Sequence, residues 1–292
     1  MPELPEVETV ANGVNERVRG QRIESVWLSF KPQTFKTSAA EMLEVLEGQR
    51  IERVRRVGKH IVFDLEEGGL EGGDLADGAP PACEPDNDGK LQWIVHLGMT
   101  GRLLVCEPAV PVPPHTHAVL GLSSGRELRF VDARRFGRLA IHRVAGEGAG
   151  FAGPGQEPLS IPVEDFVRLF RGRRLGIKLA LLNQGLLHGV GNIYADESLF
   201  RAGIRPRRMA GRLRRVELER LHASIQSVLR EAIALGGSSV SDYVDADGVA
   251  GFFQLEHKVY IRTGQPCLVC GTPIRKIVMG GRSTHYCPQC QR

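Results

Sequence analysis

Four cysteines near the end of the chain constrain its fold more than any other feature of the sequence. They form two Cys-x-x-Cys pairs, Cys267/Cys270 and Cys287/Cys290, with sixteen residues between the pairs. Each pair can supply two thiolates from one tight turn, and four thiolates complete a tetrahedral zinc site without an open coordination position. We therefore expect one structural Zn²⁺, and around it a small hairpin that needs no hydrophobic core of its own.

The remaining sequence argues against export and against a membrane. Cys83 and Cys106 stand alone, so the six cysteines do not form the disulfide framework of a secreted protein. The first ten residues, MPELPEVETV, are acidic and interrupted by proline, which excludes a secretory signal. The apolar runs are too short to cross a membrane. We expect a cytoplasmic protein that does not contact a membrane.

The first half of the chain has the pattern of an antiparallel β protein. Valines at helical spacing predict an amphipathic helix over residues 5–19, and a second, short helix over 39–47 ends at Gly48. Apolar and polar residues alternate, as strands require, over 23–30, 50–65, 91–105 and 118–143. This pattern predicts a two-layer antiparallel β-sandwich with flanking helices.

The second half is helical. A Gly/Pro-rich stretch over 146–158 separates the strand-like first half from the helical second half. Helical patterns follow over 163–171, 177–186, 193–202 and 214–235, and strand-like residues 274–278 lie between the cysteine pairs. The third helix follows a tight turn, His188–Asn192, that contains two glycines; helix pairs joined in this way occur in DNA-binding proteins. The fold class is therefore α+β.

Charge is distributed unevenly along the chain. Residues 151–292 carry 20 Lys/Arg against 12 Asp/Glu, whereas residues 1–150 carry 18 against 22. Nine of those acids, with a single lysine, fall in Asp64–Lys90, and we expect a disordered surface loop over about 66–90. Without that segment both halves are basic, which favours a polyanionic partner such as nucleic acid.

The N-terminus offers a reactive group. Cells usually remove an initiator Met before a small residue, and removal would leave Pro2 with a secondary α-amine. An α-amine has a pKa of about 7.7–8.0, so a useful fraction is neutral and nucleophilic near pH 7. Glu3 and Glu6 lie close enough in sequence to move protons. A second interpretation is structural, because acids in a first helical turn stabilise the helix dipole.

Six motifs in order carry a family resemblance over essentially the whole chain. They are MPELPEVET at 1–9, Gly58-Lys59-His60, HLGMTG at 96–101, DARRFG at 132–137, GVGNIYADE at 189–197 and the cysteine pairs. With them the chain resembles bacterial formamidopyrimidine-DNA glycosylases. The resemblance implies an enzyme that excises 8-oxoguanine and formamidopyrimidines from damaged double-stranded DNA and cleaves the abasic strand by β,δ-elimination. We expect it to act as a monomer.

The resemblance also implies roles for residues of the reaction. Pro2 would be the Schiff-base nucleophile and Glu3 the general acid and base, with Glu6 as a supporting polar group. Lys59 would contact the phosphates that flank the lesion.

Further residues would hold the DNA. Met99 and Phe136 would wedge into the space that the extruded nucleotide leaves, and Arg134 would face the orphaned cytosine; their side chains suit this work. Asn192 would bind a phosphate, assisted by amide groups at the start of the next helix. Arg282 would bind another phosphate. His115 and Lys178 match further DNA-contacting positions.

The resemblance divides the chain into parts. We expect a catalytic β-sandwich domain over 1–145, a linker over 146–160, a helix-two-turn-helix DNA-binding domain with a base-capping loop over 161–251, and a Cys₄ zinc finger over 252–292.

The chain departs from the family pattern in four places. Ala133 replaces a proline, and Val249 and Ala250 replace a lysine and a proline of the base-capping loop. Ile261 replaces a glycine, and Leu179 replaces the proline after Lys178. Most of these positions surround base recognition, so they bear on substrate preference more than on catalysis.

Two alternative functions remain open from the sequence. One is an endonuclease VIII-type glycosylase of oxidised pyrimidines, which would share the chemistry of Pro2 and Glu3. The other is a non-enzymatic zinc-finger DNA-binding protein, although retention of both residues with Glu6 and Lys59 argues against it.

Overall fold

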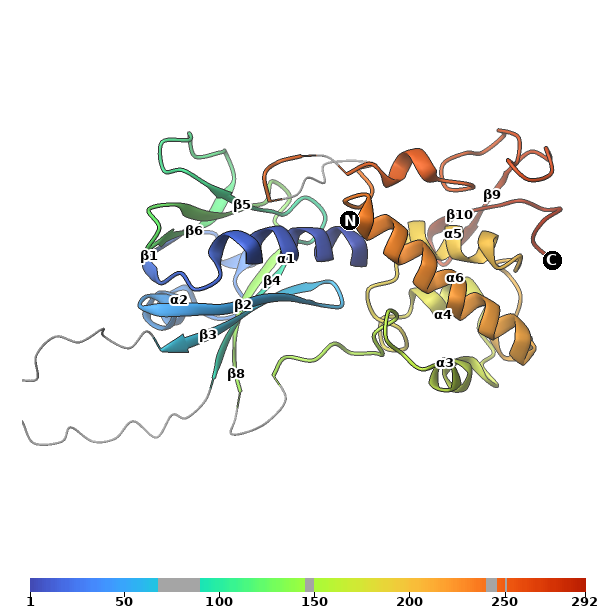
Figure 1. Ribbon diagram of the computed structural model, residues 1–292, viewed down its shortest axis with the longest axis horizontal. Coiled ribbons are helices and arrows are strands. Elements are labelled where there is room, and N and C mark those ends of the chain that lie inside the picture. Colours follow the sequence, from blue (N-terminus) through green and yellow to red (C-terminus); the bar gives the residue numbers. More distant parts are fainter. Residues whose placement is uncertain (68–89, 145–149, 240–245, 250) are drawn as a thin grey trace, which may run out of the picture.

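The computed structural model describes residues 1–67, 90–144, 150–239, 246–249 and 251–292, and the chain forms two bodies that lie side by side (Figure 1). Most of the predicted acidic loop lies outside the described residues, together with Cys83, Ala250 and the start of the predicted linker. None of the helices in the described ranges is both long and apolar enough to span a membrane.

The first body is the predicted two-layer sandwich. Its strands are all paired antiparallel. One sheet has the order β1 (Ile23–Leu28), β6 (Thr116–Leu122), β7 (Glu127–Val131), β5 (Arg102–Cys106). The other has the order β2 (Gln49–Val57), β3 (His60–Glu67), β4 (Leu91–His96), β8 (Arg138–Arg143). The 3₁₀ turn η1 (Pro32–Thr34) and helix α2 (Ala39–Leu46) follow β1.

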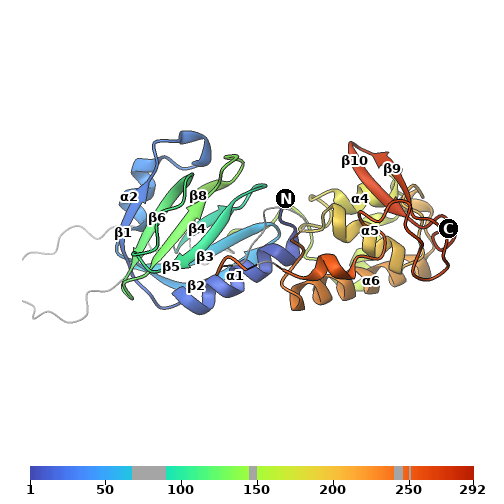
Figure 2. The same ribbon diagram turned by 90° about the horizontal axis from the view of Figure 1, so that it is seen from above.

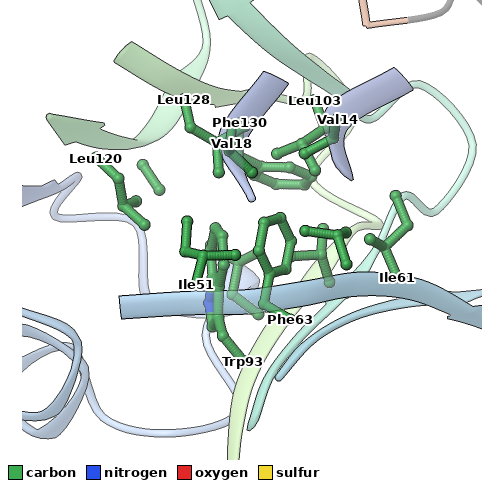
Figure 3. Close-up of a cluster of buried hydrophobic side chains, with 14 of the residues drawn as sticks. Val14, Val18, Ile51, Ile61, Phe63, Trp93, Leu103, Leu120, Leu128 and Phe130 are labelled. Carbon is green, nitrogen blue, oxygen red and sulfur yellow. The ribbon is translucent and has the colours of Figure 1, made fainter. Parts of the chain in front are cut away.

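Aromatic and branched side chains from both sheets fill the space between the layers (Figure 3). Phe63 and Trp93 lie on neighbouring strands with ring centroids 4.8 Å apart, and they face Phe130 of the other sheet. Helix α1 (Leu4–Val18) buries its valines in the same cluster, so the predicted helical spacing is confirmed. Burial of side chains of this size contributes about 1.5–3 kcal/mol each, which makes the sandwich the main source of stability in this body.

The second body consists of helices and the cysteine hairpin. Its helices are α3 (Val163–Phe170), α4 (Ile177–Leu182), α5 (Asn192–Arg201) and α6 (Arg215–Ala234), with 3₁₀ turns η2 (Ala210–Arg212) and η3 (Phe253–Glu256). Strands β9 (Arg275–Met279) and β10 (Arg282–Tyr286) form an antiparallel hairpin. Figure 2 shows the hairpin on one side of this body, beside α4, and α6 on the other.

Helix α4 is shorter than the sequence pattern predicts. The apolar residues up to Leu186 favour a longer helix, but the chain turns at Asn183, whose side-chain Oδ1 accepts from Gly185 N at 3.0 Å. An asparagine that bonds the backbone two residues on competes with the helical hydrogen-bond ladder, and the helix therefore ends there.

Helix α1 joins the two bodies. Its valines belong to the sandwich core, whereas Leu4 belongs to the core of the helical body. The amide of Leu4 donates to the carbonyl of Gly189 at 3.0 Å. The N-terminal end of α1 therefore lies between the bodies, as Figure 1 shows.

Ile261 adopts a backbone conformation that a β-branched residue rarely takes. Its φ is +53°, in the left-handed region, and its side chain is 54% exposed. This conformation costs an L-residue about 1–2 kcal/mol, and little burial compensates for the cost here. The position is one at which the sequence departs from the glycine of the family pattern.

We predict that Ile261→Gly stabilises the protein by about 1 kcal/mol, because relief of the left-handed strain exceeds the extra backbone entropy of glycine. Thermal unfolding monitored by differential scanning fluorimetry should show a higher midpoint. Ile261→Val keeps the branched side chain and should leave the midpoint unchanged. A glycine variant that unfolds at a lower temperature than the parent would contradict the assignment of strain.

Candidate active site

A cavity of about 580 Å³ lies where the two bodies meet. The segments that line it include the N-terminus, the turn between β2 and β3, the turn before α5, and the cysteine hairpin. Of the residues that the sequence predicted for catalysis or DNA contact, the cavity brings together Pro2, Glu3, Glu6, Lys59, Met99, Asn192 and Arg282. Residues from distant parts of the chain thus line the same cavity.

Glu3 is buried against the start of α5. Its carboxylate accepts hydrogen bonds from the amides of Ile193 at 3.2 Å and Tyr194 at 3.5 Å. The amides at a helix start carry partial positive charge and suit an anion. Gly191 leaves room for this contact, because a Cβ there would lie 2.2 Å from Cδ of Glu3.

The surroundings of Glu3 shift its acidity toward neutral pH. Burial raises its pKa from 4.5 to about 7, although the positive charge of Lys59 and the two amides act to lower it. A carboxyl group with a pKa near 7 can both donate and accept a proton at working pH.

Three hydrogen-bond donors hold the carboxylate of Glu6. Its carboxylate accepts from the amide of Glu3 at 2.8 Å, from the amide of Ser238 at 2.8 Å and from the hydroxyl of Tyr194. Burial raises the pKa of Glu6, against the effect of these hydrogen bonds. Glu6 therefore ties the start of α1 to α5 and to the segment that follows α6.

Lys59 occupies the tight turn between β2 and β3. Gly58, just before it, has a φ of +60°. Burial lowers the pKa of the Lys59 amine, and the charge of Glu3 opposes that effect. The turn places an amine at the cavity that also contains Pro2.

Pro2 lines the cavity together with Met1. While Met1 is present, the nitrogen of Pro2 is part of the Met1–Pro2 peptide bond. An amide nitrogen is not a nucleophile, so reactivity at this position requires removal of Met1.

Met99, Arg134 and Phe136 lie at the surface of the sandwich body. Met99 is 37% and Phe136 48% exposed, and the guanidinium of Arg134 lies 5.0 Å from the centroid of the Phe136 ring. Asp132 organises this loop, since its carboxylate accepts from Gly137 N at 2.7 Å and from Arg134 N at 3.3 Å. The loop is pinned in this way although Ala133 lacks the rigidity of proline.

His115 is exposed and has a φ of +66°, again in the left-handed region. Neither His115 nor Arg134 nor Phe136 lines the cavity itself.

Asn192 begins α5 beside the cysteine hairpin. Its Nδ2 lies 3.4 Å from Oγ of Ser283, and its Oδ1 has no hydrogen-bond partner among the described residues. The sequence predicted that the amides after Asn192 assist in binding a phosphate. In this structure the amides of residues 193 and 194 bond Glu3, so the predicted phosphate contact at Asn192 depends on its side chain and stays a prediction.

Lys178 does not face the cavity. Its side chain is fully buried, and its ammonium contacts Asp196 at 2.7 Å, Ser283 O at 2.8 Å and Thr284 Oγ1 at 2.9 Å. One ion pair and two hydrogen bonds within the protein engage its buried ammonium, so the predicted contact with DNA is not supported. Lys178 instead joins α4, α5 and β10, and the sequence alone carries no signal for this pairing.

Other residues of the cavity escaped sequence reasoning. Gln184, Ser238 and Tyr260 all line it. Their residue types are common in turns and cores, so only the fold reveals their position.

The four predicted zinc ligands converge. The sulfurs of Cys267, Cys270, Cys287 and Cys290 all lie within 4.8 Å of one another. Two of the contacts are 3.8 Å for Cys267–Cys290 and 3.5 Å for Cys270–Cys287. Sulfurs of a tetrahedral site with zinc–sulfur bonds of about 2.3 Å lie about 3.8 Å apart, so this set fits Zn²⁺. With zinc bound, the site would support the β9–β10 hairpin, which places Arg282 at the cavity.

The acidity of Glu3 predicts how stability depends on pH. Above pH 4.5 the unfolded chain loses the Glu3 proton, but the folded chain keeps it until about pH 7, so stability falls as the pH rises through this window. We predict that Glu3→Gln, which cannot ionise, stabilises the protein by about 3 kcal/mol at pH 8.5 and has little effect at pH 4.5.

This experiment uses an N-terminally tagged chain, in which Pro2 keeps an amide nitrogen as it does here. Chemical denaturation at the two pH values gives the two free energies of unfolding. Glu24→Gln, at an exposed position of β1, is the matched control and should show no pH-dependent gain. Equal effects of Glu3→Gln at both pH values would show that Glu3 is not neutral in the fold.

Comparison with known proteins identifies related sequences along the whole chain. Three family models match: the formamidopyrimidine-DNA glycosylase N-terminal domain over residues 1–139, the formamidopyrimidine-DNA glycosylase H2TH domain over 155–244, and the zinc finger found in FPG and IleRS over 264–292. The last match agrees with the cysteine geometry, and the prediction of one structural zinc is confirmed.

Individual relatives agree with the family models. The chain is 42% identical to a formamidopyrimidine-DNA glycosylase of Solibacter usitatus and 38% identical to one of Listeria monocytogenes, each over the full length of both proteins. Among solved structures, MutM (FPG) from Thermus thermophilus is 39% identical with a TM-score of 0.80, covering 99% of this chain and 98% of that one. Fpg of Lactococcus lactis in complex with DNA containing an abasic site is 31% identical with a TM-score of 0.82, covering 99% of each. The chain therefore belongs to the formamidopyrimidine-DNA glycosylase family.

Proposed function

We propose that this enzyme excises oxidised purines from duplex DNA and cleaves the abasic strand, with Pro2 as the nucleophile. The observation that carries the proposal is the convergence of Pro2, Glu3 and Lys59 in one cavity between the two bodies. Relatives support the substrate class, since a mutant of Lactococcus lactis FPG has been solved in complex with DNA that contains Fapy-dG.

Catalysis begins once Met1 has been removed. The nitrogen of Pro2 attacks C1′ of the damaged nucleotide, and the bond from C1′ to the base breaks as the base takes up a proton. Opening of the sugar ring gives an iminium ion between Pro2 and C1′. Glu3 is the group placed to move protons in these steps, because it adjoins Pro2 and its pKa is close to neutral.

The iminium ion then permits elimination. Loss of a proton from C2′ breaks the C3′–O bond, and a second elimination breaks the C5′–O bond, so both phosphates leave. Water finally hydrolyses the iminium ion, which returns the amine of Pro2 and releases the sugar fragment. Each step proceeds by proton transfer and requires no redox partner.

Basic and polar groups around the cavity would hold the phosphates beside the lesion. Lys59 and Arg282 supply positive charge at the cavity, and Asn192 lines the same cavity. Phosphate contacts orient the duplex without reading its sequence.

Exposed residues of the sandwich body would fill the gap that the extruded nucleotide leaves in the duplex. Extrusion of a nucleotide costs a few kcal/mol and leaves a gap in the stack. We propose that Met99 and Phe136, both partly exposed, enter this gap, and that Arg134 hydrogen-bonds the orphaned base. His115 would contact the backbone nearby.

The remaining organisation follows from this function. We propose that the enzyme acts as a monomer on damaged double-stranded DNA in the cytoplasm. The catalytic unit would extend over residues 1–145, the DNA-binding helices and base-capping loop over 161–251, and the finger over 252–292, with 146–160 as the linker.

Borohydride reduction tests the proposal. Wild-type protein with Met1 removed, incubated with a duplex that contains 8-oxoguanine opposite cytosine, should give a covalent protein–DNA adduct, because reduction captures the iminium ion. Pro2→Gly should reduce the yield at least tenfold, since it replaces the secondary amine by a less basic primary amine and removes the ring. Gel electrophoresis of labelled DNA measures both.

Two controls sharpen the result. An N-terminal tag blocks the nitrogen of Pro2 and should abolish the adduct, whereas Lys59→Ala should still give it. A duplex with thymine glycol should react more slowly than 8-oxoguanine. No adduct from wild-type protein would support a binding protein without catalysis, and faster reaction with thymine glycol would support a pyrimidine-specific enzyme.

A further inference from the structure

His188 lies at the seam between the two bodies, and none of the roles above uses it. It begins the turn that leads into α5, and its imidazole is buried. The ring packs against two glycines from other segments. A Cβ on Gly58 would lie 2.7 Å from Nδ1 of His188, and one on Gly153 would lie 1.9 Å from the same atom. The absence of a side chain at both glycines therefore leaves room for this ring.

Glu157 connects the imidazole to a buried arginine. Nε2 of His188 lies 3.3 Å from Oε2 of Glu157, and the same oxygen accepts from NH1 of Arg56 at 2.9 Å. Arg56 also donates from Nε to Glu8 at 2.5 Å, which ties the group to α1. Although burial acts to raise it, the neighbouring His188 and Arg56 hold the pKa of Glu157 at about 2. Glu157 is therefore ionised throughout the working pH range.

This group of side chains holds Gly58 from two directions. NH1 of Arg56 donates to the carbonyl of Gly58 at 3.2 Å, and the ring of His188 lies against its Cα. Gly58 directly precedes Lys59, whose side chain lines the cavity. A shift of the turn would carry the ammonium of Lys59 with it.

We propose that His188 is a positioning residue for Lys59, acting through Gly58 and through the Glu157–Arg56 pair. The inference rests on the proposed function, because it assigns to Lys59 a contact with the phosphates beside the lesion. His188 does not line the cavity in this arrangement. Its effect is on the rate of the chemical step, since Lys59 would orient the lesion through the phosphates and a misplacement of about 1 Å can slow a reaction up to a hundredfold.

A double-mutant cycle tests the proposal. Single-turnover excision of 8-oxoguanine, with enzyme in excess over the duplex, is measured for wild type, His188→Ala, Lys59→Ala and the double variant. We expect His188→Ala to be about tenfold slower, and the double variant to be no slower than Lys59→Ala, because one contact is lost in both. Affinity for a duplex with an uncleavable abasic analogue should change less than about twofold in His188→Ala, because the proposed effect is on the chemical step.

A purely structural role gives a different pattern. The two substitutions would then slow the reaction independently, and their effects would multiply in the double variant. That result would overturn the proposal, as would an unchanged rate in Lys59→Ala or in His188→Ala.

Two further variants separate positioning from folding. His188→Gln keeps an N–H donor toward Glu157 and should recover most of the rate that His188→Ala loses, at a similar thermal midpoint. His222→Ala removes another partly buried histidine, whose Nε2 bonds Ile161 O at 2.9 Å, and should leave the rate unchanged. Failure of glutamine to recover the rate would contradict the role of the Glu157 contact.

The outcomes distinguish this inference from the proposed function. Wild-type protein that neither excises the lesion nor forms a borohydride adduct would disprove the proposed function. An active wild type with multiplicative effects of His188 and Lys59 would disprove only the positioning role.

Discussion

The contact between the carboxylate of Glu3 and the first amides of α5 is the interaction on which the active site depends. Glu3 belongs to the end of a helix whose valines are part of the sandwich core, and the amides belong to the helical body. A buried carboxylate needs donors, and the start of a helix supplies them together with a favourable dipole. The contact therefore fixes Pro2, one residue earlier, between the two bodies.

The turn before α5 makes this contact possible because it approaches the N-terminus so closely. The carbonyl of Gly189 accepts a hydrogen bond from the amide of Leu4, and Gly189 also packs against the Leu4 side chain. Gly191 packs against the side chain of Glu3. His188, at the start of the same turn, packs on the loop that carries Lys59. One short segment thus places Pro2, Glu3 and Lys59 relative to one another. The same segment explains why the cavity forms at the seam and not within either body.

The success of sequence reasoning depended on how local each feature is. The cysteine spacing predicts the zinc site because its ligands come from two short turns, and alternation predicts the strands because each buries one face. Residue patterns alone left the role of Pro2 open, and the family resemblance supplied the site. Two features stayed out of reach, the burial of Lys178 against Asp196 and the contact of Glu3 with Ile193. The second joins residues 190 positions apart, so only the packed fold brings them together.

The most direct test of the account is to locate the covalent bond. After borohydride reduction with a lesion duplex, proteolysis and mass spectrometry would identify the peptide that carries the sugar fragment. We expect the modified peptide to begin at Pro2, to lack Met1 and to carry the added mass on its terminal nitrogen. Modification of Lys59, or of a peptide that retains Met1, would contradict it.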